Sequence, residues 1–171
     1  MVEFVYAVVT KTPVWVYVLF IFLLMRGIKA RKPATVSLEK LAIVPAIFLL
    51  WDIYDLVAHH QLTVSSLLMW CSGLVIGAFI GYRLVNPAQI TVASEVRSIN
   101  RPADYSVLPL MMVAFVIKYI LGVIGSVSPE TLQQPSGHTV AIVSGGLFAG
   151  LFVGKFIHYL RCYFLVTYRA S

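Results

Sequence analysis

Charged side chains are scarce in this sequence. Only 12% of its 171 residues are charged, against roughly 25% in ordinary soluble domains. The mean hydropathy is +0.88 and 60% of the residues are hydrophobic. A soluble chain of this size has no means of burying so much apolar surface, so the composition indicates a protein that resides in a lipid bilayer. At this length we expect one domain covering residues 1–171.

Cysteines are few and several catalytic motifs are missing. Cys71 and Cys162 lie in different apolar segments, so we expect no disulfide between them. The sequence contains no nucleotide-binding glycine loop, HExxH motif or nucleophile elbow. This predicts a protein that is not an enzyme. No basic region precedes the first apolar run, so we also expect no cleavable signal peptide.

Five apolar segments dominate the chain. They lie near residues 13–30, 40–58, 64–84, 104–126 and 138–162. At a rise of about 1.5 Å per residue, each is long enough to approach or cross a hydrocarbon core about 30 Å thick. We therefore predict an all-α, polytopic membrane helix bundle with five transmembrane helices. Between the third and fourth segments, β-branched residues alternate with polar ones, which predicts a short cytoplasmic β-hairpin over 90–99, with an irregular loop as the alternative.

The distribution of basic residues predicts the orientation. Eleven of the 13 Lys and Arg residues lie in or near the connection between the first two segments, in or near the connection between the third and fourth, or near the C-terminal end. Five transmembrane helices would place all eleven on one side of the membrane. Only Lys11 lies on the other side, and Lys118 lies inside the fourth segment. Because basic connections stay in the cytoplasm, we predict an outside N-terminus and a cytoplasmic C-terminus. This distribution over several connections also argues against a nucleic-acid partner.

Glycines recur every four residues in two of the segments. The two sets are Gly73, Gly77 and Gly81, and Gly146, Gly150 and Gly154. This spacing puts each set on one helix face, where another helix can approach closely. The sets align at an offset of 73 residues, and Pro45 and Pro109 lie near the starts of the preceding segments. We therefore predict two parallel helical-hairpin repeats plus one unpaired helix, with chance similarity as the alternative.

Three charged residues lie inside the apolar segments. Asp52 and Asp55 are three residues apart and share a helix face, and Lys118 should lie at a similar depth. A lone charge there costs about 2.5–3.5 kcal/mol, so we expect Lys118 to pair with Asp55 or Asp52. The cluster predicts a site for a ligand, a proton or an ion. The alternative is an ion pair that only determines which helices are neighbours.

Three histidines are expected at the outer face. His59 and His60 close the second segment, and His138 opens the fifth. They are weak candidates for metal or haem ligands, because their spacing matches no metal motif. Interface histidines explain them better, so we predict no metal site and leave any cofactor open.

Several short stretches resemble a family of small, uncharacterised bacterial inner-membrane proteins that share a domain of unknown function. They are residues 12–16 (TPVWV), 108–110 (LPL), 118–119 (KY) and 150–155 (GLFVGK), together with the basic connection that precedes Pro45. The resemblance extends over nearly the whole chain. It implies a location in the bacterial cytoplasmic membrane, and it implies no activity and no catalytic residue.

These observations favour a small transporter or permease-like protein with a polar site at Asp52, Asp55 and Lys118. The first alternative is a non-catalytic membrane scaffold or accessory subunit, and a weaker one is a haem- or metal-binding redox accessory. We expect membrane lipids as partners and leave a homodimer open. A water-accessible cavity at the charges would favour transport, whereas a dry, fully paired cluster would favour the scaffold.

Overall fold

The protein is mostly helical. The computed structural model describes residues 12–59, 63–85, 90–93 and 97–170. Its helices are α2 (Val14–Ala30), α3 (Leu38–His59), α4 (Val64–Arg83), α5 (Val107–Val127), the short α6 (Pro129–Gln133) and α7 (Pro135–Ala170). The all-α prediction is confirmed. The helices follow the five predicted segments within a few residues, except that α7 continues to Ala170 instead of ending near residue 162.

Three of the described helices are long and apolar enough to cross a membrane. They are α4, α5 and the Pro135–Thr167 part of α7. Capping side chains and proline mark where two of the helices begin. The hydroxyl of Thr63 accepts a hydrogen bond from the backbone N–H of Ser66 and caps the first turn of α4. Pro129, which needs no backbone partner for its nitrogen, opens α6.

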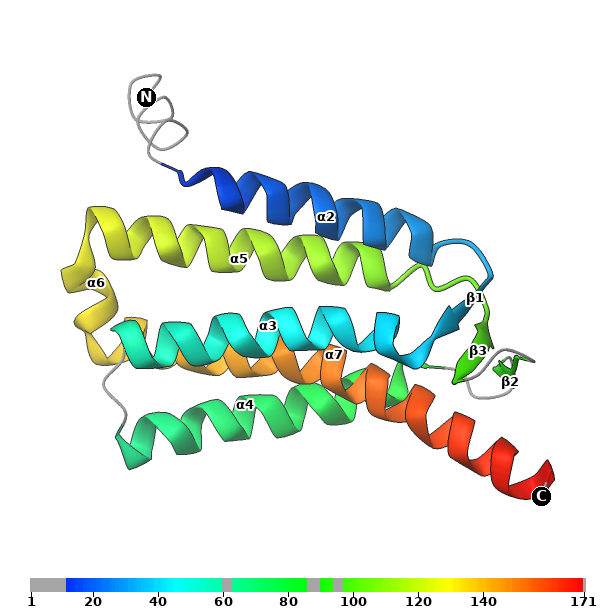
Figure 1. The fold of residues 1–171 in the computed structure, drawn as a ribbon. Helices are drawn as coiled ribbons and strands as arrows, with labels where there is room; N and C mark the ends of the chain where they lie inside the picture. Colours follow the sequence, from blue (N-terminus) through cyan, green and yellow to red (C-terminus); the bar gives the residue numbers. More distant parts are fainter. Residues whose placement is uncertain (1–11, 60–62, 86–89, 94–96, 171) are drawn as a thin grey trace.

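The order of the helices in space differs from their order in the chain. The main helix pairs are α4 with α7, α3 with α7 and α2 with α5. In Figure 1, α7 lies between α3 and α4, although α3 and α4 follow one another in the sequence. The second and third segments therefore do not form a closely packed hairpin of their own.

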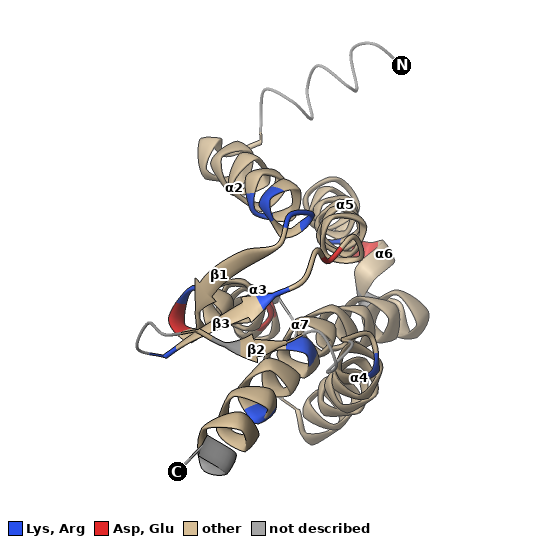
Figure 2. Cartoon of the chain, turned by 90° about the vertical axis from the view of Figure 1, so that its right-hand side faces the viewer, with Lys and Arg blue, Asp and Glu red and all other residues tan. Residues whose placement is uncertain are grey.

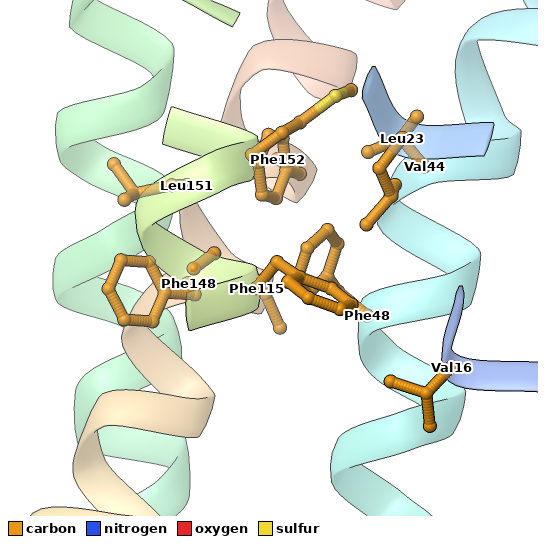
Figure 3. Close-up of a cluster of buried hydrophobic side chains, with 11 residues drawn as sticks. Val16, Leu23, Val44, Phe48, Phe115, Phe148, Leu151 and Phe152 are labelled. Carbon is orange, nitrogen blue, oxygen red and sulfur yellow. The ribbon is translucent and has the colours of Figure 1, made fainter. Parts of the chain in front are cut away.

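A single apolar cluster joins the α2–α5 pair to α3 and α7. Figure 3 shows side chains from these helices meeting in the interior. The rings of Phe48 on α3 and Phe152 on α7 stack with their centroids 4.7 Å apart. Phe115 on α5 lies 5.2 Å from Phe20 on α2, centroid to centroid. Trp51 on α3 lies edge-on to Phe115 on α5, with 6.3 Å between the ring centroids, and this aromatic contact joins the two halves of the bundle.

A small antiparallel sheet closes one end of the bundle. Its strands are β1 (Ala34–Ser37), β2 (Thr91–Val92) and β3 (Ser98–Arg101), in the order β1-β3-β2. Strands β2 and β3 form the predicted hairpin, with Val92 opposite Ile99. β1 was not predicted, because residues 34–37 are short and follow a run of basic residues. Ile99 is fully buried and packs with Leu38 and Tyr159, which fastens the sheet to α3 and α7.

The two glycine sets face each other across the α4–α7 contact. A Cβ added to any of the six would overlap a backbone carbonyl oxygen of the other helix. The contact is reciprocal, because each carbonyl lies three residues before the equivalent glycine. The pairs are Gly73 with Val143, Gly77 with Leu147, Gly81 with Leu151, Gly146 with Trp70, Gly150 with Leu74 and Gly154 with Ala78. The two helices thus run parallel and touch backbone to backbone.

Candidate functional site

The structure brings Asp52, Asp55 and Lys118 together. Asp52 and Asp55 lie one turn apart on α3, and Lys118 reaches them from α5. The Nζ atom of Lys118 contacts Oδ1 of Asp52 and donates a hydrogen bond of 3.1 Å to Oδ2 of Asp55. One ammonium group therefore bridges two carboxylates, and the contact joins α3 to α5.

The two carboxylates differ in their access to the surroundings. The side chains of Lys118 and Asp52 are only 4% and 2% exposed, whereas that of Asp55 is 34% exposed. Oδ2 of Asp52 accepts a hydrogen bond of 3.4 Å from the indole nitrogen of Trp70. The ring centroid of Trp51 lies 6.0 Å from Nζ of Lys118. Asp52 is thus sealed inside the bundle, while Asp55 forms an open edge of the same cluster.

A small cavity adjoins the charges. Its volume is about 10 Å³, and Asp52, Asp55, Lys118, Trp70 and Gly145 contribute to its wall. That is room for about one water molecule. A Cβ at Gly145 would lie 2.9 Å from Oδ1 of Asp52 and 3.2 Å from Nζ of Lys118, so only glycine lets α7 close over the cluster without displacing a charge. In this conformation the cavity admits water, a proton or a small ion, but no organic solute.

Sequence reasoning missed two residues of this site. Neither Trp70 nor Gly145 is among the residues that the sequence predicts for the site. A tryptophan in an apolar helix gives no indication that its N–H is turned toward a carboxylate on another helix. Gly145 departs from the four-residue glycine spacing, and this departure is the one feature that distinguishes it in the sequence.

A second buried ion pair lies at the sheet end of the bundle. Nζ of Lys155 lies 2.6 Å from Oδ2 of Asp104 and 2.7 Å from the hydroxyl of Ser106. Ser106 also donates its N–H and O–H to Oδ1 of Asp104, at 3.0 and 2.7 Å. Burial raises the pKa of Asp104, but the hydrogen bonds and charge of Lys155 and Ser106 outweigh it and hold the pKa below its usual value. Asp104 is therefore an ionised partner for Lys155.

This second pair corrects how Lys155 is interpreted. The sequence places it among the basic residues of the C-terminal connection, whereas its side chain is 5% exposed and paired. Arg101 is likewise buried, and its guanidinium donates to the carbonyl oxygens of Ala30 and Lys29 at the end of α2. These two cations hold the sheet end of the bundle together instead of facing solvent.

The histidine candidates are only partly described. His60 and the side chain of His59 lie outside the described residues, and His138 lies in the first turn of α7. Among the residues that the structure describes, no three His, Cys, Asp or Glu side chains form a group suited to a metal ion. The prediction that the three histidines form no metal site therefore stays untested, and they stay weak candidates for ligands.

The fold and the charged cluster define a class of protein: a helical membrane protein with a buried, two-carboxylate ion-pair site. Comparisons with protein-family models, with curated proteins and with solved structures found no match. The resemblance to uncharacterised bacterial inner-membrane proteins therefore stays a prediction.

Proposed function

We propose that the protein is a small multi-pass transporter of the bacterial cytoplasmic membrane that carries protons through Asp52, Asp55 and Lys118. The observation that carries the proposal is the asymmetry of the cluster, with an open carboxylate and a sealed one on the same ammonium. A proton that binds Asp55 neutralises that carboxylate and leaves Lys118 paired with Asp52 alone. The size of the cavity supports a proton in preference to an organic substrate.

We further infer that all five long helices cross the membrane. α2 has 17 residues and is about 26 Å long, and α3 has 22 residues and is about 33 Å long. Both present apolar side chains outward, including Val18 and Ile21 on α2 and Leu50 and Ile53 on α3, each at least 48% exposed. Such surfaces are costly in water and are favourable against lipid.

Five spans and a cytoplasmic sheet end lead to a topology that reporter fusions can test. The end of α2, the start of α3, the end of α4 and the start of α5 all lie at the sheet end. Figure 2 looks onto this end and shows Lys and Arg on α2, α4, α7 and the sheet. Fusions after residues 33, 61, 95, 132 and 171 should report inside, outside, inside, outside and inside. A cytoplasmic result at residue 132 would eliminate the five-span arrangement.

An internal repeat is part of the same proposal. The reciprocal glycine contacts support a twofold relation between α4 and α7 at an offset of 73 residues. The preceding helices are placed differently, since α3 packs on α7 whereas α5 packs mainly on α2. We therefore propose a repeat whose symmetry is retained at the glycine contact and has been lost around it.

Proton transport is tested by reconstituting the purified full-length protein into liposomes that contain a pH-sensitive dye. After an external acid step, with the membrane potential clamped by potassium and valinomycin, these liposomes should acidify faster than protein-free ones. The double variant Lys118→Met with Asp52→Asn should return the rate to the protein-free level. Glu130→Gln, on the short helix α6, is the matched control and should keep the faster rate. Equal rates with and without the native protein would contradict the proposal.

A membrane scaffold is the second candidate. The burial of Asp52 and Lys118 and the bond from Trp70 favour it, because a sealed cluster that joins α3 to α5 holds helices in place. A native protein that is folded in liposomes but carries no protons would support the scaffold. The redox-accessory alternative depends on His59, His60 and His138, which are only partly described.

A further inference from the structure

A larger groove lies far from the charged cluster, between the start of α3 and the C-terminal part of α7. Its volume is about 520 Å³. Ala42, Phe156 and Leu160 supply apolar parts of its wall, and Glu39 and Arg97 supply charges. An inference about this groove depends on the membrane location of the protein and not on proton transport.

The groove lies at the level where the helices meet the sheet. Phe156 follows Lys155, whose ammonium contacts Asp104 and Ser106 just before α5 begins. Glu39 lies in the first turn of α3, directly after β1, and Ala42 lies one turn further along the helix. The charged part of the groove is therefore at the sheet. Ala42 and Phe156 continue its wall into the bundle, and Tyr163, Phe164 and Thr167 continue it along α7 past the sheet. Ala42 and Phe156 thus lie on the membrane side of the two charges, as the acyl part of a lipid lies on the membrane side of its headgroup.

Among the described residues, the two charges of the groove have no competing ion-pair partner. Neither Glu39 nor Arg97 forms an ion pair with another residue in the described part of the chain. Arg97 is held in a turn with φ of 55°, and its carbonyl oxygen accepts a 2.9 Å hydrogen bond from the N–H of Leu38. This bond places Arg97 beside Leu38, the residue that precedes Glu39. A carboxylate and a guanidinium are thus presented together above an apolar surface.

We propose that this groove binds a phospholipid with an ethanolamine-type headgroup. The phosphate pairs with Arg97, the primary ammonium donates to Glu39, and an acyl chain lies along Ala42, Phe156 and Leu160. A lipid with net negative charge is disfavoured, because Glu39 repels it. A quaternary ammonium is disfavoured as well, because it has no N–H to donate to the carboxylate.

The test is native mass spectrometry of the delipidated full-length protein in detergent. An equimolar mixture of phosphatidylethanolamine, phosphatidylglycerol and phosphatidylcholine is added, and bound lipids are counted by mass. The native protein should bind phosphatidylethanolamine most strongly. Glu39→Gln should remove its preference over phosphatidylcholine. Arg97→Asn, which tolerates the positive φ, should weaken the binding of all three lipids about two- to fivefold.

Two charge-matched controls separate this site from general surface charge. Glu130→Gln and Arg83→Gln change residues outside the groove and should leave both the affinity and the preference unchanged. Ala42→Trp should fill the groove and remove the bound lipid. The proposal fails if the native protein shows no preference for ethanolamine lipid, or if Glu39→Gln keeps that preference. A dimer that forms in place of the lipid-bound monomer would also overturn it, because a second copy would then occupy the groove.

Discussion

Lys118→Met is expected to lower the free energy of unfolding by about 3–5 kcal/mol, because it leaves a buried carboxylate without its ammonium partner. The side chain of Asp52 is 2% exposed, so water replaces little of the lost interaction. The measurement is thermal unfolding of the purified protein in detergent, followed by tryptophan fluorescence. Lys40→Met removes the same charge from an exposed position and should change the melting temperature far less.

A second substitution should identify which carboxylate, Asp52 or Asp55, stabilises the fold by pairing with Lys118. Lys118→Met with Asp52→Asn should recover most of the lost stability, because asparagine matches the shape of aspartate and needs no counter-charge. Asparagine is preferable to leucine here, since α7 closes over Asp52 at Gly145. Asp55→Asn should recover less, because the Asp55 side chain is 34% exposed and partly solvated. Better recovery with Asp55→Asn would reassign the pair, and no recovery with either would exclude this pairing.

Gly77→Leu is expected to separate α4 from α7 and to lower the melting temperature strongly. Even the Cβ of alanine would overlap the carbonyl oxygen of Leu147, and a backbone oxygen has no rotamer by which to move away. Overpacking of this kind costs about 1–3 kcal/mol for a small addition, and leucine adds more. Gly150→Leu should have a similar effect, because its Cβ would overlap the carbonyl oxygen of Leu74.

Gly122 offers a matched control in another helix. A Cβ at Gly122 on α5 would meet no described atom within 4 Å. Gly122→Ala should therefore be neutral or stabilising by up to about 1 kcal/mol, since alanine has the higher helix propensity. Thermal unfolding of Gly77→Ala and Gly122→Ala under the same conditions compares the two positions directly. Equal melting temperatures would show that the glycine faces of α4 and α7 are not in contact.

The helices and the charge cluster follow closely from local sequence. Apolar length predicts α2 to α5 to within a few residues, because each helix satisfies its own backbone hydrogen bonds and needs no distant residue to do so. The three-residue spacing of Asp52 and Asp55 puts both on one face, and the cost of a lone charge in lipid requires a partner for Lys118. These inferences use helical periodicity and solvation alone, and the three side chains do meet.

The choice of neighbours depended on packing between residues far apart in the chain. Helical periodicity shows that the glycines of each set share a helix face, but it does not say which helix packs on that face. In the structure, the glycine face of α4 packs on the glycine face of α7. Asp104 and Lys155 are 51 residues apart, and a basic residue at a helix end looks solvated until a carboxylate is folded against it. β1 likewise becomes a strand only because β3 lies beside it. Such contacts form when separate faces match in shape and charge, and that match exists only in three dimensions.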